Sequence, residues 1–233
     1  MKIFIDAGHR NNSLDYGAIG NGQRESALAL SICNKLKNEL EKFNIICYMS
    51  RTSEEEVVSL SKRTTQANNL NVDLFLSVHT NSSSNLGATG VEVLYYSNFN
   101  LADKLSEEIS IKCNTINRGA KERKDLHVLT ASRMPAILIE CGFISSSKEC
   151  TNLSNSAYQD KIVSAIVDTI IREYKITIDV NIDLEYEESI KLLNQEGIIN
   201  TLAAWQDPKK IKIENVPFLI KNMGRYIKYY IKI

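Results

Sequence analysis

Residues 72–79 read VDLFLSVH, and this stretch decides the fold class. Its apolar residues recur at every second position from Val72 to Val78, which is the pattern of a β-strand with one apolar face. Comparable short strands are expected at 2–6, 45–50, 90–96, 126–130 and 136–140. Apolar residues at helical spacing predict helices at 25–43, 57–70, 99–116 and 157–174. Strands that alternate with helices predict an α/β fold, a mixed sheet flanked by helices on both faces.

Chemically active side chains stand where the predicted strands end. His9 follows the first strand and His79 ends VDLFLSVH, while Glu25 begins the helix at 25–43. Functional groups of α/β sheets gather at such strand ends, so these three residues are expected to converge at one sheet edge. Two imidazoles and a carboxylate suit a zinc ion with one open position. Purely structural histidines are the alternative, because this spacing matches no short metal motif.

Glu140 follows three aliphatic residues, at the end of the strand expected at 136–140. An unpaired carboxylate is costly to bury, so this residue needs a physical reason. One interpretation is a salt bridge with Arg133 or Arg118. The functional interpretation is a general base with a raised pKa beside the metal site.

Composition excludes several classes of protein. The 233 residues include 28 basic and 28 acidic ones, which argues against a nucleic-acid binder. No run of about 18 apolar residues occurs, so no membrane-spanning segment is expected. The five cysteines form no CxxC pair, which argues against a disulfide framework. The N-terminal MKIFIDAGHR lacks the apolar core of a secretory signal, so we expect synthesis in the cytoplasm without a signal peptide.

Eight blocks follow one another along the chain: IDAGH, DYGAIGNG, SRT, LSKRTTQAN, DLFLSVHTN, GVEVLYY, NRGAK and PAILIECGF. Their order resembles that of the zinc-dependent N-acetylmuramoyl-L-alanine amidases of bacterial and phage cell-wall lysis, catalytic family three. The resemblance covers roughly residues 2–175 and implies a catalytic domain over 1–175. It also implies one zinc ion per chain, bound by His9, Glu25 and His79, with Glu140 as the catalytic glutamate.

The reaction implied by the resemblance is hydrolysis of the amide between N-acetylmuramic acid and the L-alanine of the stem peptide, in the peptidoglycan of a Gram-positive wall. Three further residues match recurrent family positions and either contact substrate or support loops: Asn81, Arg118 and Lys121. Three others depart from the usual pattern: Arg10, Cys141 and Ser146. None of these departures removes a zinc ligand or the glutamate.

Three alternatives stay open at this stage. A cysteine hydrolase built on Cys141 is disfavoured, because an adjacent acid raises the pKa of a thiol. A wall-binding pseudoenzyme is disfavoured, because all three ligands and the glutamate are present. The third alternative concerns the setting: a phage endolysin released through a holin, or a host autolysin freed when a mother cell lyses. The sequence leaves the oligomeric state undetermined.

Residues 176–233, the tail of the chain, differ from the rest in how their charged residues are distributed. We expect a linker at 176–184 and a small helical module at 185–233. Residues 176–208 carry seven acids and one base, whereas 209–233 carry seven bases and one acid. Such blocks indicate helices paired by charge or a binding face. We interpret the module as wall-binding through Trp205, Tyr226 and Tyr229, with a role in the module's own core as the alternative.

Overall fold

A six-stranded sheet, in the order β4-β1-β5-β8-β6-β7, forms the centre of the molecule. The computed structural model describes residues 1–10 and 15–176, so the predictions for the tail from residue 177 onward lie outside it. The strands are β1 (Lys2–Ala7), β4 (Ile46–Met49), β5 (Leu74–Asn81), β6 (Val91–Tyr95), β7 (Asn117–Glu122) and β8 (Ala136–Phe143). Neighbouring strands are parallel except β6 and β8, which confirms the predicted mixed sheet.

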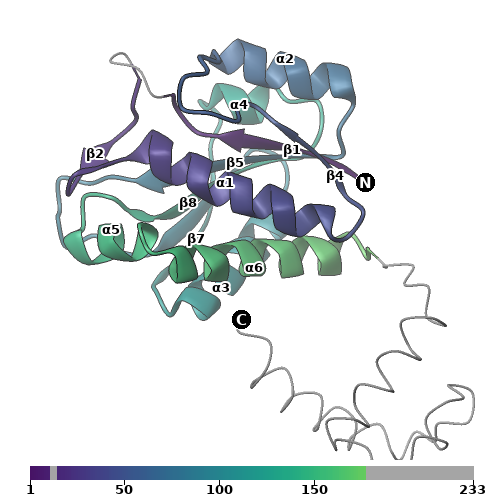
Figure 1. The fold of residues 1–233 in the computed structure, drawn as a ribbon. Helices are drawn as coiled ribbons and strands as arrows, with labels where there is room; N and C mark the ends of the chain where they lie inside the picture. Colours follow the sequence, from purple (N-terminus) through teal and green to yellow (C-terminus); the bar gives the residue numbers. More distant parts are fainter. Residues whose placement is uncertain (11–14, 177–233) are drawn as a thin grey trace, which may run out of the picture. The chain divides into compact units, whose positions relative to one another are not determined.

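Helices cover both faces of the sheet, as predicted. They are α1 (Glu25–Glu41), α2 (Leu60–Leu70), α3 (Phe99–Cys113), α4 (His127–Thr130), α5 (Ser147–Leu153) and α6 (Ser156–Glu173). Figure 1 shows α1 and α6 side by side on one side of the sheet, and α2 with α4 on its other side. None of the helices in the described ranges is long and apolar enough to cross a membrane.

The alternation of side chains along each strand explains the two layers. In β1, Ile3 and Ile5 enter the larger hydrophobic core, beneath α1, α3 and α6. Phe4 points the opposite way and stacks on Phe75, with ring centroids 5.5 Å apart, in the smaller core beneath α2 and α4. Successive side chains of a strand point to opposite faces, so both faces of these central strands must be apolar.

The prediction of a strand at 126–130 is wrong, because this segment contains the one-turn helix α4. The amide of Ala131 donates to the carbonyl of His127 at 2.9 Å, which closes the turn. Val128 and Leu129 are consecutive, and both are buried in the smaller core. A helical turn can bury two adjacent side chains on one side, whereas a strand sends them to opposite faces. Tertiary packing therefore overrides the β-propensity of LHVLT.

Within the six-stranded sheet, the sequence analysis did not predict β7. Among the described strands it pairs with β6 alone, so it lies at an edge of the sheet, and its six residues are exposed or half-buried. An edge strand needs no apolar face, which is why NRGAKE carries no alternating signal. Also unpredicted were α5 and the short hairpin of β2 (Ile19–Gly20) and β3 (Gln23–Arg24).

Candidate metal centre and active site

His9 lies in the turn that follows β1. The amide of Gly8 donates to the carbonyl of Val78 at 3.0 Å, and His9 then takes a left-handed conformation with φ of 56°. A Cβ atom at Gly8 would lie under 3.0 Å from three atoms of the His79 ring. Glycine at this position therefore lets the two histidines approach, and their rings meet edge to face with centroids 4.9 Å apart.

Glu25 is the first residue of α1, where the positive end of the helix dipole favours a carboxylate. Its Oε1 atom lies 2.8 Å from His79 Nδ1 and 3.3 Å from His9 Nε2. Backbone amides hold the carboxylate in place: Thr80 donates to Oε1 at 3.2 Å and Ala18 donates to Oε2 at 2.8 Å. The carboxylate oxygen is thus held between the two imidazole nitrogens.

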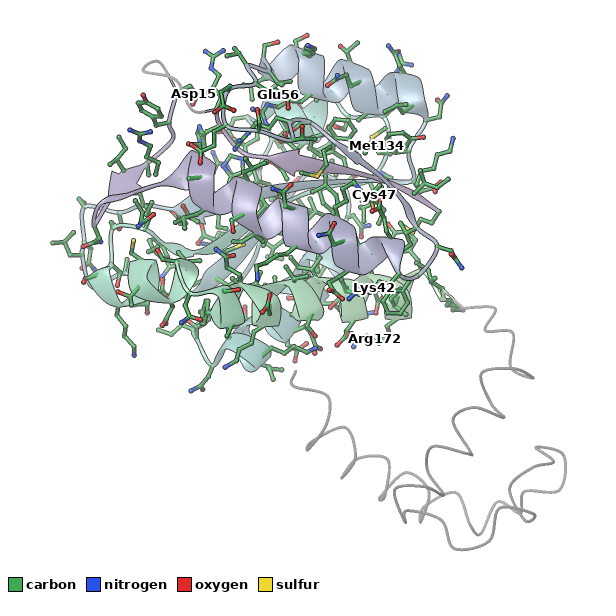
Figure 2. All side chains as sticks on the ribbon, in the orientation of Figure 1. Asp15, Lys42, Cys47, Glu56, Met134 and Arg172 are labelled. Atoms are coloured by element: carbon green, nitrogen blue, oxygen red, sulfur yellow. The ribbon has the colours of Figure 1, made fainter. Side chains whose placement is uncertain are left out.

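Asp15 orients the ring of His9 from the side opposite Glu25. Its Oδ1 atom lies 2.6 Å from His9 Nδ1, which leaves Nε2 to face Glu25. A carboxylate behind a histidine ligand fixes the ring and its tautomer, and it raises the basicity of the ligating nitrogen. Figure 2 shows Asp15 at the end of the domain where α1 begins, whereas Lys42 and Arg172 lie where α1 and α6 end.

These residues fit a zinc ion. The ligand atoms of His9, Glu25 and His79 all lie within 4.8 Å of one another. Two imidazole nitrogens and one carboxylate oxygen form a donor set of catalytic zinc sites, in which three protein ligands leave a fourth position open. The structure therefore brings together the three residues that the sequence predicted.

Electrostatics also suit a cation at this point. Burial by itself lowers the pKa of His9, but Glu25 and Asp15 outweigh it and raise the pKa to about 9. Burial by itself raises the pKa of Glu25, but the hydrogen bonds and charges of His79 and His9 hold it well below its usual range. Glu25 is therefore ionised at neutral pH, and the site attracts positive charge.

Glu140 lies beside the metal centre on β8. It is the register partner of His79 in the parallel β5–β8 pair and of Glu92 in the antiparallel β6–β8 pair. Its Oε2 atom is buried and has no hydrogen-bond partner within residues 1–10 and 15–176. Burial raises the pKa of Glu140 to about 7. The salt bridge considered with Arg118 does not form, because that guanidinium pairs with Glu92 instead.

A cavity of about 670 Å³ opens over these groups, within the size range of ligand sites. His9, Glu25, His79 and Glu140 all line it. Around them stand residues that sequence reasoning gave no role, among them Asp15, Arg63, Arg123, Leu126 and His127. Arg63 lies on α2, and the other four come from loops and the short helix α4. The sequence did not mark any of the five, because their approach to the cavity depends on how the elements pack.

The three family-matched residues converge on Glu92, which sequence reasoning missed. Asn81 Nδ2 donates to Glu92 Oε1 at 2.9 Å and Arg118 Nε donates to Oε2 at 3.1 Å, while Lys121 Nζ pairs with the same oxygen. Of the three, only Asn81 lines the cavity. Burial by itself raises the pKa of Glu92, but Lys121 and Arg118 outweigh it and lower the pKa. The sequence did carry a sign of Glu92, because it is a charged residue among the apolar residues of GVEVLYY.

The departures from the family pattern leave the centre intact. Arg10 lines the cavity, with its Nε 3.7 Å from Asp15. Ser146 is the residue before α5. Cys141 is fully buried in the larger core, where burial raises the pKa of its thiol well above the usual value. A neutral thiol on the opposite face of β8 cannot serve as the nucleophile of this cavity.

The fold and the site together define an α/β domain with a candidate metal centre beside a partly buried acid. A family model described as N-acetylmuramoyl-L-alanine amidase matches residues 3–172. The chain therefore belongs to the N-acetylmuramoyl-L-alanine amidase family, and this makes it an enzyme of the amidase class.

Individual relatives agree with this membership. The amidase LytC of Bacillus subtilis is 31% identical over 179 residues, which cover 74% of this chain but only 35% of LytC. The amidase CwlM of Bacillus licheniformis is 33% identical over 216 residues, covering 90% of this chain and 82% of CwlM.

Solved structures share the fold. The crystal structure of an N-acetylmuramoyl-L-alanine amidase from Clostridium difficile 630 superposes with a TM-score of 0.69 at 34% identity, covering 75% of this chain and 96% of that one. The catalytic domain of the CD27L endolysin gives a TM-score of 0.66 at 26% identity, covering 74% of this chain and 97% of that one.

Proposed function

We propose that this chain hydrolyses the amide between the lactyl group of N-acetylmuramic acid and the L-alanine of the stem peptide, with one zinc ion held by His9, Glu25 and His79. Glu140 is the general base. The position of Glu140 carries the proposal, because its buried Oε2 atom has no hydrogen-bond partner among the described residues and the side chain neighbours His79 at the same cavity. A carboxyl group that the protein leaves unsatisfied is available to a water molecule or to the substrate.

A bound zinc ion supplies a Lewis acid that polarises a carbonyl group and lowers the pKa of water toward 7. Glu140, in its ionised form, takes a proton from the attacking water and delivers it to the departing alanine nitrogen. Burial raises its pKa to about 7 and a bound cation would lower it again, so the ionised form that accepts the proton is populated near neutral pH. This balance suits a group that must first accept and then donate a proton.

The test compares Glu140→Gln with Glu41→Gln, a control at the far end of α1. We expect Glu140→Gln to lose about 10²–10⁴-fold in the release of new N-terminal alanine from purified peptidoglycan. Metal analysis should still find one zinc per chain, and the control should behave as wild type. A chelator should abolish wild-type activity and added zinc should restore it. Full activity in Glu140→Gln would rule out the proposed base.

For the biological setting, we propose a phage endolysin that reaches the wall when a holin opens the membrane. Its likeness to the CD27L endolysin domain supports this setting. Expression in a Gram-positive host should cause lysis only when a holin is produced with it. Lysis without the holin would contradict release through a holin. The alternative, a host autolysin freed when a mother cell lyses, would reach the wall only after that lysis.

We further propose that the segment 185–233 binds the wall, on the basis of its aromatic residues and its separated charges. Binding is best measured with the full chain carrying Glu140→Gln, so that the wall stays intact. Trp205→Ala, Tyr226→Ala and Tyr229→Ala in that background should reduce pelleting with purified walls. Unchanged pelleting of all three variants would count against wall binding through these side chains.

A further inference from the structure

Two arginines lie buried beneath the metal centre, and the proposed chemistry does not use either. Arg51 follows β4 and is 0% exposed, while Arg63 belongs to α2 and is 2% exposed. Removing a guanidinium cation from water is costly unless its donors are satisfied. The partners of these two side chains therefore show what they stabilise.

Arg63 holds the backbone on which His9 stands. Its Nη1 atom pairs with the Asp6 carboxylate and donates to the carbonyl of Ala7 at 2.7 Å. Its Nη2 atom donates to the carbonyl of His9 itself, also at 2.7 Å. Ser77 Oγ donates to the other oxygen of Asp6 at 2.7 Å, which anchors this network to β5.

Arg51 joins the segment before His9 to the start of α1. Its Nη2 atom donates both to the carbonyl of Gly8 at 3.0 Å and to the carbonyl of Ser26 at 2.6 Å. Gly8 precedes His9 and Ser26 follows Glu25. One nitrogen atom therefore ties together the backbone neighbours of two candidate ligands. Its Nε atom also donates to Ala7 at 3.2 Å.

The geometry of the turn explains why guanidinium groups suit this role. The carbonyls of residues 7–9 all accept hydrogen bonds from these two arginines, at the point where β1 ends and His9 turns left-handed. A planar guanidinium presents its donors in a rigid fork, so it can hold several carbonyls at fixed mutual positions. The ammonium of lysine is a single point on a flexible stem and cannot reproduce that spacing.

We propose that Arg51 and Arg63 are positioning residues that set the separation and orientation of His9 and Glu25 for metal binding. The inference deepens the proposed function and rests on it. Their hydrogen bonds go to the backbone carbonyls around His9 and Glu25 and not to the three ligand side chains, so both would act through the backbone that carries the ligands.

The test measures zinc affinity of the full chain by competition with a chromophoric chelator, at a temperature where all variants are folded by circular dichroism. Arg51→Lys keeps the cation but loses the fork, and should weaken zinc binding about 10–100-fold, the usual effect of disturbing the support of metal ligands. Leu40→Ala is the control, because Leu40 is fully buried at the other end of α1. It should lower the Tm while leaving the zinc affinity unchanged.

Cobalt(II) adds a spectroscopic measurement, since its visible absorption depends on ligand geometry. Arg51→Lys should alter the cobalt spectrum, whereas Leu40→Ala should not. Asp6→Asn provides a second variant that loosens Arg63 without deleting a guanidinium, in case Arg51→Lys does not fold; it removes the charge of a buried ion pair, so its folding is checked in the same way. Its zinc affinity should fall in the same direction.

Several outcomes would overturn the inference. If Arg51→Lys keeps the wild-type zinc affinity and cobalt spectrum, the arginines do not position the ligands. If Arg51→Lys is unfolded, wild-type zinc affinity in Asp6→Asn would show the same. An equal loss of affinity in Leu40→Ala would reduce their role to general stability. If the wild type binds no zinc at all, the proposed function itself fails. Wild-type zinc binding and amidase activity with no effect of Arg51→Lys would remove this inference alone.

Discussion

Replacing Asp15 with asparagine tests how far the site depends on the carboxylate behind His9. Asp15 Oδ1 lies 2.6 Å from His9 Nδ1, and the Asp15 side chain is 39% exposed, so the substitution leaves the hydrophobic cores untouched. Asparagine keeps the shape and one acceptor oxygen but removes the negative charge. A change in zinc affinity therefore reports on the electrostatics of this one contact.

Two effects of opposite sign determine how much zinc affinity Asp15→Asn loses. Removing the carboxylate support of a histidine ligand weakens metal binding by about 10–100-fold, which corresponds to about 1.4–2.8 kcal/mol. Burial alone lowers the pKa of His9, but Glu25 and Asp15 together raise it to about 9. Because zinc must displace that proton, wild-type affinity falls by about tenfold per pH unit below this pKa. Asp15→Asn lowers the pKa of His9 and therefore loses less affinity on acidification.

The assay is chelator competition from about pH 6.5 to about pH 9.5, across the range where His9 loses its proton. At the alkaline end Asp15→Asn should bind zinc about 10–100-fold more weakly than wild type, and the difference should narrow toward the acid end. Asp160→Asn, an exposed carboxylate on α6 paired with Lys35, is the matched control and should follow wild type. Equal affinities at the alkaline end would refute the supporting role, and a difference that widens with acidity would refute the pKa argument.

Two further substitutions and one pH profile test the site and the core directly. Gly8→Ala should weaken zinc binding by about tenfold or more in the same competition assay, because the new Cβ displaces the His79 ring. The acid limb of the kcat/KM profile should have its midpoint between 4.5 and about 7, since burial raises the pKa of Glu140 and a bound cation lowers it again; a midpoint outside this window would contradict the assignment. Phe4→Ala removes a buried ring stacked on Phe75 and should cost about 3–5 kcal/mol in urea unfolding, with unchanged zinc affinity of the folded protein.

The sequence was sufficient to predict the layers of the fold and to point to the candidate ligands. Strands buried on both faces need apolar residues at fixed positions, so VDLFLSVH and AILIE were readable from the chain alone. His9 follows β1, and His79 and Glu140 lie near the carboxyl ends of β5 and β8, which a parallel arrangement brings to one edge of the sheet. The ordered sequence blocks added the chemistry, because the family resemblance identified which acids and histidines matter.

Only the tertiary structure decided what surrounds those ligands. β7 lies at an edge and LHVLT packs as a helical turn, and neither outcome depends on local pattern. Glu92 collects three polar partners, and the two buried arginines hold the carbonyls beneath His9, through contacts between residues far apart in the chain. Periodicity reports only which face of an element is buried, whereas a hydrogen bond between distant residues exists only after the sheet register and helix packing have brought its two atoms together.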